Sequence, residues 1–150
     1  PIDPPTGLFI GVGANPCAVD PEREIERYFR KIDAGAEFAI TQPVSDPEAL
    51  RRFLDRVETY RRKIPVLAGV WPLLSFKNAE FMNNEVPGVV VPKAILERMA
   101  RCRTREDGRK AGIDIAHGIV ERISDRVNGF QVSAPMGHVE TALAVLGKSS

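Results

Sequence analysis

The sequence predicts an α/β fold in which about four parallel strands are covered by helices. Short apolar runs alternate with segments whose apolar residues recur at helical spacing, as a sheet buried beneath helices requires. A proline also lies just past each apolar run, where its missing N–H ends a strand sharply. These strand ends read Asn15-Pro16, Gln42-Pro43, Trp71-Pro72 and Ala134-Pro135.

The first unit is a strand over Leu8–Val12 followed by a helix. Asp20–Glu22 supplies an N-cap residue, a proline at the first helical position and an acid near the positive helix end. The helix should end at Gly35, because glycine favours the left-handed conformation of a helix stop. The apolar face consists of Ile25, Tyr28, Phe29 and Ile32.

The second unit repeats this pattern with a strand over Glu37–Thr41 and a helix that begins at Asp46–Glu48. The buried face of that helix comprises Leu50, Phe53, Leu54 and Val57. A third strand over Val66–Trp71 leads into a helix near Phe76–Asn83. The alternation of strand and helix therefore continues into a third unit.

The remainder of the chain is mostly helical up to a fourth strand. Pro87–Pro92 interrupts the chain before a short helix over Lys93–Arg101, and Thr104–Asp107 is a cap for a long helix. The buried stripe of the long helix consists of Ala111, Ile115, Ala116, Ile119 and Ile123. A turn at Asn128-Gly129 precedes the strand Phe130–Ser133, and a last helix runs from about His138 to Leu146.

Four strand–helix units are too few to close an eight-stranded barrel. Either the chain is a doubly wound domain, or it is the second half of a barrel with two open sheet edges. The proline-rich start, Pro1–Pro5, favours a fragment. The expected organisation is a linker or boundary over residues 1–7, the half barrel over 8–147 and a tail over 148–150.

Composition excludes several classes of function. The net charge of +1, from 21 basic and 20 acidic residues, gives no electrostatic case for nucleic acid or an anionic membrane. No apolar run approaches the roughly 20 residues that span a bilayer, and no signal-peptide pattern opens the chain. The two widely separated cysteines favour a reduced, cytoplasmic setting. Cys17 and Cys102 form no CxxC pair, and His117 and His138 are the only histidines, so no metal site is expected.

The strand ends also suggest a site. In an α/β barrel the carboxyl ends of the strands form the active face, so Asn15, Gln42 and Trp71 would point toward one shared mouth. The alternative is that these residues and their prolines simply terminate strands. Spacing alone leaves both interpretations open.

Three stretches resemble the methylenetetrahydrofolate reductase family. They read GAEFAITQPVSDPEALRRF, IPVLAGVWPLLSFKNAEFMNNEVPGV and, further on, GIDIAHGIVERI with VNGFQVSAP. The resemblance runs from about Phe9 to Leu146 and implies the C-terminal half of the catalytic (β/α)8 TIM barrel. The TQPV and NNEVPG stretches are similar to the bacterial form that is fused behind a homocysteine S-methyltransferase domain.

The resemblance implies an oxidoreductase of one-carbon metabolism and methionine biosynthesis. In that family NAD(P)H reduces a bound FAD, which then reduces 5,10-methylenetetrahydrofolate to 5-methyltetrahydrofolate. Gln42 matches the glutamine that binds the pterin, and Asn78 matches a position that helps to hold folate. Met82 matches an aromatic residue near the substrate, and core packing is an equal alternative for it. Met136 stands where the family has an arginine on the folate tail.

The same resemblance places FAD on the first helix and on the loop before it. The implied cofactor contacts are Asn15, Asp20, Glu24, Arg27, Arg30 and Lys31. Cations here suit a pyrophosphate, because arginine can bind phosphate oxygens bidentately. Glu24 replaces the usual aspartate and Arg27 the usual asparagine, and without the resemblance a solvated face with a Glu24–Arg27 ion pair is favoured.

No catalytic residue is assigned within the chain, because the family's general acid is a glutamate on the first barrel strand, upstream of Pro1. The expected partners are folate, NAD(P)H and the missing N-terminal half of the barrel, and a homo-oligomer is kept open. The fragment alone is expected to bind FAD weakly or not at all. Two other functions remain: a non-catalytic half-barrel assembly module, and a pterin-binding barrel of the methyltransferase type without flavin.

Overall fold

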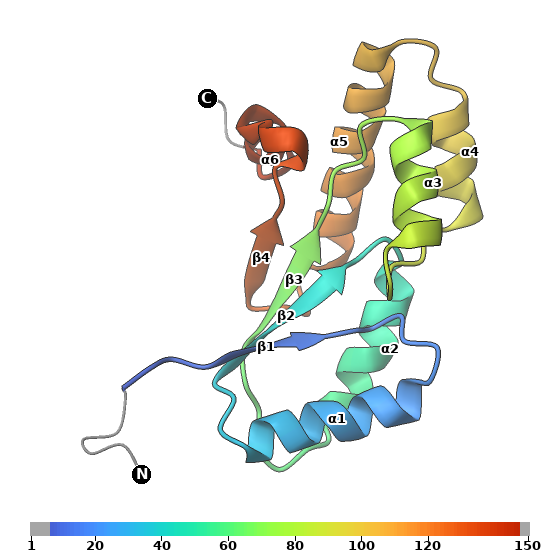
Figure 1. Cartoon of the computed structure of the whole chain (residues 1–150). Helices are drawn as coiled ribbons and strands as arrows, with labels where there is room; N and C mark the ends of the chain where they lie inside the picture. The colour runs from blue at the N-terminus through green and yellow to red at the C-terminus, as the bar shows by residue number, and fades with distance from the viewer. Residues whose placement is uncertain (1–6, 148–150) are drawn as a thin grey trace.

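The computed structural model describes residues 7–147 as one parallel sheet with helices (Figure 1). The strands are β1 (Gly11–Ala14), β2 (Phe38–Pro43), β3 (Val66–Val70) and β4 (Gly129–Val132), and all three pairings are parallel. Their order in the sheet, β1-β2-β3-β4, is also their order in the sequence. In a doubly wound sheet the strand order reverses at a switch point, whereas in a barrel consecutive strands remain neighbours. The observed order therefore confirms the prediction of a half barrel.

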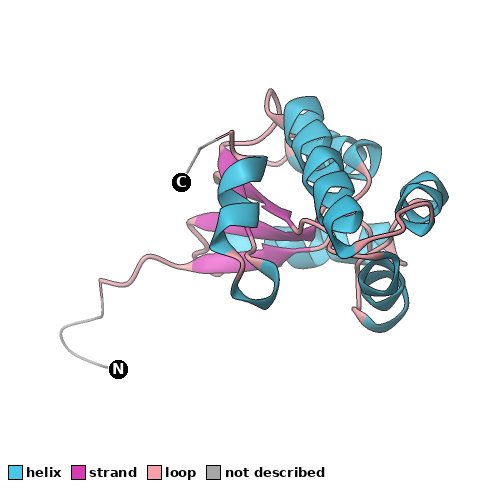
Figure 2. Ribbon diagram, turned by 90° about the horizontal axis from the view of Figure 1, so that it is seen from above, coloured by secondary structure: helices cyan, strands magenta, loops and turns pink. Residues whose placement is uncertain are grey.

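The helices connect the strands and lie mostly on one side of the sheet (Figure 2). They are α1 (Pro21–Asp33), α2 (Pro47–Val57), α3 (Phe76–Glu85), α4 (Lys93–Ala100), α5 (Arg105–Ile123) and α6 (Val139–Val145). A single turn of 3₁₀ helix, Pro135–Gly137, precedes α6, which lies beyond the carboxyl end of β4 (Figure 1). The predicted linker, except for residue 7, and the predicted tail fall outside the described residues.

Helix boundaries follow the predicted caps. The Asp20 carboxylate accepts the backbone N–H of Arg23 at 3.0 Å, and Asp46 does the same for Glu48 at 3.0 Å. Gly35 has a φ of 107°, the left-handed conformation predicted for the end of α1. Thr104 and Asp107 form the reciprocal capping box that starts α5.

Two glycines on α5 let the helix contact the backbone of another segment directly. A Cβ atom on Gly108 would lie 2.6 Å from the Leu74 carbonyl oxygen, and one on Gly112 would clash with the Leu73 carbonyl oxygen. Only glycine permits this approach. α5 therefore fixes the loop that follows β3, which is one of the loops at the carboxyl edge of the sheet.

The two faces of the sheet differ in burial. Alternate strand residues that point toward the helices are buried, among them Ala39, Thr41 and Ala68. Their neighbours Phe38, Ile40 and Leu67 are only partly buried, and Gln42 and Gln131 are exposed. We call the second set, Phe38, Ile40, Gln42, Leu67 and Gln131, the open face. In a closed barrel this face would line the interior.

The strand boundaries depart most from the sequence prediction at the start of β1 and the end of β2, and elsewhere by one or two residues. The first strand begins at Gly11 rather than Leu8, because the Ile10 N–H is bound by the Glu37 carboxylate at 2.9 Å instead of a strand carbonyl. Leu8 and Phe9 are 74% and 68% exposed. The second strand continues through Pro43, where the prediction ended it before that residue.

The described residues contain no helix that is both long and apolar enough to cross a membrane. Both cysteines are free. His117 contacts two helices: its Nδ1 lies 3.1 Å from the Val145 carbonyl oxygen, and its Nε2 lies 3.4 Å from Glu121. It therefore joins α5 to the end of α6.

Candidate functional site

A β-bulge places Gln42 at the carboxyl end of β2. The pairing of β2 with β3 shifts between Ile40 and Pro43, so that Pro43 lies opposite Gly69. The Thr41 hydroxyl accepts the Gly69 N–H at 2.9 Å and donates to the Gln42 carbonyl at 2.8 Å. Bulges of this kind redirect side chains beside functional sites. The bulge explains how the strand passes Pro43 without leaving the Gly69 N–H unpaired.

Gly69 on β3 is required by the same β-bulge. A Cβ atom there would lie 2.5 Å from the Thr41 carbonyl oxygen, so the bulge needs a glycine on the neighbouring strand. The roles of Thr41 and Gly69 in the bulge were not predicted from the sequence. The only available signal was the proline within an apolar run, since prolines inside strands are confined to edges and bulges.

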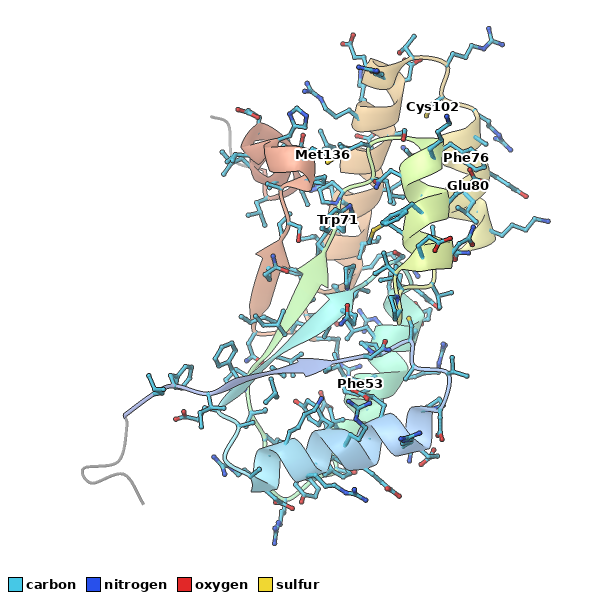
Figure 3. All side chains as sticks on the ribbon, in the orientation of Figure 1. Phe53, Trp71, Phe76, Glu80, Cys102 and Met136 are labelled. Atoms are coloured by element: carbon cyan, nitrogen blue, oxygen red, sulfur yellow. The ribbon has the colours of Figure 1, made fainter. Side chains whose placement is uncertain are left out.

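The loop after β3 forms the next part of the mouth. The Asn78 side-chain oxygen accepts the Leu74 N–H at 3.2 Å, and the Asn78 N–H donates to the Ser75 hydroxyl at 3.2 Å. Asn78 thus holds the start of α3, and its side-chain NH₂ group remains as a donor. Trp71 is half-buried at this edge, above the sheet in Figure 3, and its indole nitrogen has no partner in the described part of the chain.

Met82 is 4% exposed and packs in the main hydrophobic core with Ala79 and Val89. This location favours core packing, the alternative that the sequence left open for Met82. Helix α3 ends at Glu85, two residues past the end predicted near Asn83. Met136, after β4, is 90% exposed.

Glu24 and Lys31 of α1 bind the backbone of β1 and of the residue that follows it. The Glu24 carboxylate accepts the Asn15 N–H at 3.0 Å, and Lys31 Nζ donates to the Gly13 carbonyl at 2.6 Å. β1 is an edge strand, so these two side chains satisfy backbone groups that no described strand pairs. The solvated face that the residue pattern favoured is wrong for Glu24, which is 5% exposed.

The other predicted cofactor residues lie around this pair. Asp20 caps α1, and the Asn15 side-chain oxygen accepts the Cys17 N–H at 3.1 Å. Arg27 is exposed and lies 3.7 Å from Glu24, while the exposed Arg30 lies 3.4 Å from Glu26. The structure therefore brings Arg27, Arg30 and Lys31 together within little more than one turn of α1.

These three cations outnumber the two nearby acids, Glu24 and Glu26, so this part of α1 carries a net positive charge. Their N–H groups are the donors that bind the diphosphate of a dinucleotide cofactor. The Arg30–Glu26 pair is exposed on both sides, so it contributes little and is readily exchanged, and Arg27 is itself exposed although its partner Glu24 is buried. Glu24 itself is already bound to the Asn15 N–H, so its part is to position the loop before α1.

A cavity of about 680 Å³ lies between that loop and the start of α2. Its charged lining consists of Glu22, Glu24, Asp46, Asp55, Arg52 and Arg56. Because acids outnumber bases, this cavity suits a diphosphate less well than the outer face of α1 does. Cys17 also lines it, and burial, followed by the nearby Asp46 carboxylate, raises the pKa of this thiol.

A third group of basic side chains lies beside the loop after β3. A cavity of about 570 Å³ is lined by Leu74, Ser75, Arg105, Glu106, Arg109 and His138. From the sequence, Arg105 was predicted only as part of a helix cap, and Arg109 was not predicted to belong to a site. The spacing of Arg105 and Arg109 in the sequence does not indicate a site, because only the fold brings the start of α5 next to the segment after β4.

Comparison with known proteins gives a consistent result. The family profile described as methylenetetrahydrofolate reductase matches residues 10–143. Methylenetetrahydrofolate reductase 2 of Schizosaccharomyces pombe is 27% identical over 140 residues, which are 87% of this chain and 21% of that protein. The 5,10-methylenetetrahydrofolate reductase of Escherichia coli is 35% identical over 66 residues, 44% of this chain and 22% of that protein. The chain thus spans about a fifth of the length of these relatives.

A solved structure supports the fold. An uncharacterised protein from Clostridium thermocellum that binds two copies of 5-methyl-5,6,7,8-tetrahydrofolic acid matches with a TM-score of 0.61 at 24% identity. The match covers 92% of this chain and 52% of that one. At this identity the likeness concerns the fold alone.

Proposed function

The chain belongs to the methylenetetrahydrofolate reductase family, and from this premise we propose that it forms the folate-binding part of a reductase. The reaction proposed is reduction of 5,10-methylenetetrahydrofolate to 5-methyltetrahydrofolate, with NAD(P)H as the electron donor. The observation that carries the proposal is the exposed amide of Gln42, held by a bulge at the carboxyl edge of the open face. The folate ligand of the Clostridium protein supports the same class of substrate.

Gln42 suits a pterin ring. A primary amide offers two donors and an acceptor oxygen, which match the mixed donor and acceptor edge of a pterin. It does so without the desolvation cost of a charged group. The Thr41–Gly69 hydrogen bond fixes the backbone that carries this amide, so that Gln42 orients the ring rather than follows it. Asn78 supplies further donors at the next strand end.

FAD is the proposed cofactor, and Arg27, Arg30 and Lys31 would bind its diphosphate on the outer face of α1. When bound, the flavin supplies the redox chemistry that connects NAD(P)H to folate. The protein's part is to hold and orient: Glu24 fixes the loop at Asn15, and Lys31 fixes the end of β1. The general acid is proposed to come from outside these residues, since no acidic side chain lies on the open face.

A second half barrel is the proposed partner that completes the site. The open face is apolar at Phe38, Ile40 and Leu67, and Phe9 stacks on Phe38 with ring centroids 5.1 Å apart. Burial of this surface would give a large hydrophobic driving force for association. The same surface favours the alternative function, a non-catalytic assembly module. A stable monomer of 16.5 kDa in light scattering would argue against any self-pairing.

Calorimetric titration with 5-methyltetrahydrofolate tests the proposal. We expect saturable binding that Gln42→Ala weakens by about tenfold, the value of one or two hydrogen bonds to the ring. Gln131→Ala is the matched control, because Gln131 is exposed on the same face but already bonds Ser133 at 3.3 Å. Equal effects of the two substitutions would refute the assignment of Gln42. In the complete reductase, Gln42→Glu should impair folate reduction more than NAD(P)H oxidation.

A further inference from the structure

A separate pocket lies at the amino ends of the strands, the end of the sheet opposite the carboxyl-end mouth. It has a volume of about 340 Å³ and lies between α1, α2 and the segments that precede β3 and β4. Its apolar walls are Ile32, Leu54, Val57, Ile64 and Val66. No residue of the proposed folate or FAD sites lines it.

One polar group on its wall has no partner. Tyr28 lines the pocket and is 2% exposed, yet its hydroxyl makes no hydrogen bond to any described residue. Burial, with no charge or hydrogen bond contributing, raises the pKa of Tyr28 to about 12. The phenol is therefore a neutral donor at physiological pH. The hydroxyl is not one of the fully buried, unpaired side-chain atoms of the described residues, so it reaches the open space of the pocket and can donate to a ligand there.

The charged groups around the pocket are mostly donors. Arg126 is bound by Asp55 at 2.7 Å and by Glu58 at 3.2 Å, so the nearby acids are already paired. Arg62 uses one N–H to reach the Ile32 carbonyl at 3.3 Å, which leaves its other N–H groups available.

Two more donors complete the rim. Lys63 forms no ion pair with the described residues. The Asn128 side-chain oxygen accepts the Val66 N–H at 2.9 Å, so its NH₂ group remains. With the phenol, Arg62, Lys63 and Asn128, the pocket presents unused donors and no unused acid.

We propose that this pocket binds a small monocarboxylate with an apolar body, whose carboxylate accepts from the Tyr28 hydroxyl and pairs with Lys63 and Arg62. The volume is at the low end of the roughly 300–1,000 Å³ of small-molecule sites, which limits the ligand to one ring or a short chain. A single water occupies about 30 Å³ of liquid, far less than this space. The apolar walls contact the body of the ligand, and the donors select an anion over a neutral compound.

Titration of the 150-residue chain with 3-phenylpropionate, followed by thermal shift and by NMR, tests the inference. The probe should bind saturably and raise the melting temperature. Tyr28→Phe should weaken binding by about tenfold, because it removes one hydrogen bond to a charged acceptor and keeps the ring. Lys63→Gln should weaken binding and reduce its dependence on salt. Lys110→Gln, which removes the same charge from α5, should leave the affinity unchanged.

Selectivity between an acid and its neutral amide distinguishes this site from a cavity that binds by apolar contact alone. Competition with 5-methyltetrahydrofolate distinguishes it from the folate site. The neutral 3-phenylpropionamide should bind at least tenfold more weakly than the acid, and 5-methyltetrahydrofolate should not displace the acid. The proposal fails if the amide binds as well as the acid, if Lys63→Gln has no effect, or if no saturable binding occurs. Lys63 is exposed, so its substitution leaves the fold intact even where Tyr28→Phe lowers stability.

Discussion

The two faces of the sheet are built from the same strands and yet have different chemistry. On the helix-covered face, small or branched residues such as Ala39, Ala68 and Val70 are at most 1% exposed. On the open face, the larger Phe38, Ile40 and Leu67 are only partly buried, and Gln42 and Gln131 are exposed. One face holds the domain together, whereas the other is available for a ligand or a partner.

Apolar strand residues therefore do not by themselves show where the core lies. Exposed apolar patches on a folded domain mark interaction surfaces. The open face combines such a patch with an amide at its carboxyl edge, where α/β barrels place their sites. Substitutions on the two faces should therefore differ in their effects on stability and binding.

The largest expected difference is between two leucines. Leu50 on α2 is 0% exposed, so Leu50→Ala should lower the free energy of unfolding by about 2–5 kcal/mol. Leu67→Ala on the open face should cost less than about 1.5 kcal/mol, because its side chain is only partly removed from water. Urea denaturation followed by circular dichroism measures both. Similar losses would show that the open face is as well packed as the covered one.

A second difference concerns the helix that supports the loop after β3. Gly112→Ala should destabilise the domain by about 1–3 kcal/mol, because the new methyl group would clash with the Leu73 carbonyl. Gly118→Ala on the same helix meets nothing within 4 Å and should stabilise by up to about 1 kcal/mol. Thermal melts of the two variants should move in opposite directions. A shift of the same sign would contradict the role assigned to Gly112.

The bulge links the two faces, since Thr41 is buried beneath Gln42. Thr41→Val keeps the shape but leaves the Gly69 N–H unpaired, at a cost of about 1–3 kcal/mol. It should also weaken binding of 5-methyltetrahydrofolate, because Gln42 loses its fixed backbone. Thr59→Val, at an exposed hydroxyl that donates to the Arg56 carbonyl, is the control. Unchanged folate affinity in Thr41→Val would separate the bulge from the site.

The smallest effect depends on pH and lies at the end of α1. Hydrogen bonds from Tyr60 and Arg61 lower the pKa of Asp33 from its ordinary 3.8. A lowered carboxyl pKa stabilises the fold above the unfolded value, and this stabilisation is lost as the pH falls through the folded value. Asp33→Asn should therefore reduce the stability slightly at pH 7 and flatten the acid limb below pH 3.8. Melting temperatures of the two proteins at about five pH values between pH 2 and 7 measure this difference in stability.

Helices and strand order could be predicted from the sequence, whereas parts of the site could not. Asp20, Asp46 and Thr104 act on their own neighbours, so their caps are local and readable. The hydrogen bond of Thr41 to Gly69 and the clash that keeps residue 112 a glycine join segments far apart in the chain. No local pattern encodes such contacts.

Residue patterns also misjudged exposure at two places. Helical spacing put Glu24 on a solvated stripe, but it is buried because the end of β1 needs its carboxylate. Leu8 and Phe9 have the composition of a strand, yet strand pairing begins only at Gly11 because Glu37 takes the Ile10 N–H. Whether Asn15, Asp20, Arg27 and Arg30 contact FAD stays a prediction.

The central claim is that the open face binds folate through Gln42. The chain has two glutamines, so NMR of ¹⁵N-labelled protein reports on both side-chain NH₂ groups, and Gln42→Ala assigns them. On addition of 5-methyltetrahydrofolate, the account predicts that the Gln42 amide shifts strongly and saturably, while Gln131 shifts less and the buried residues of α1 and α2 stay unchanged. Saturable binding that leaves the Gln42 amide unmoved would contradict it.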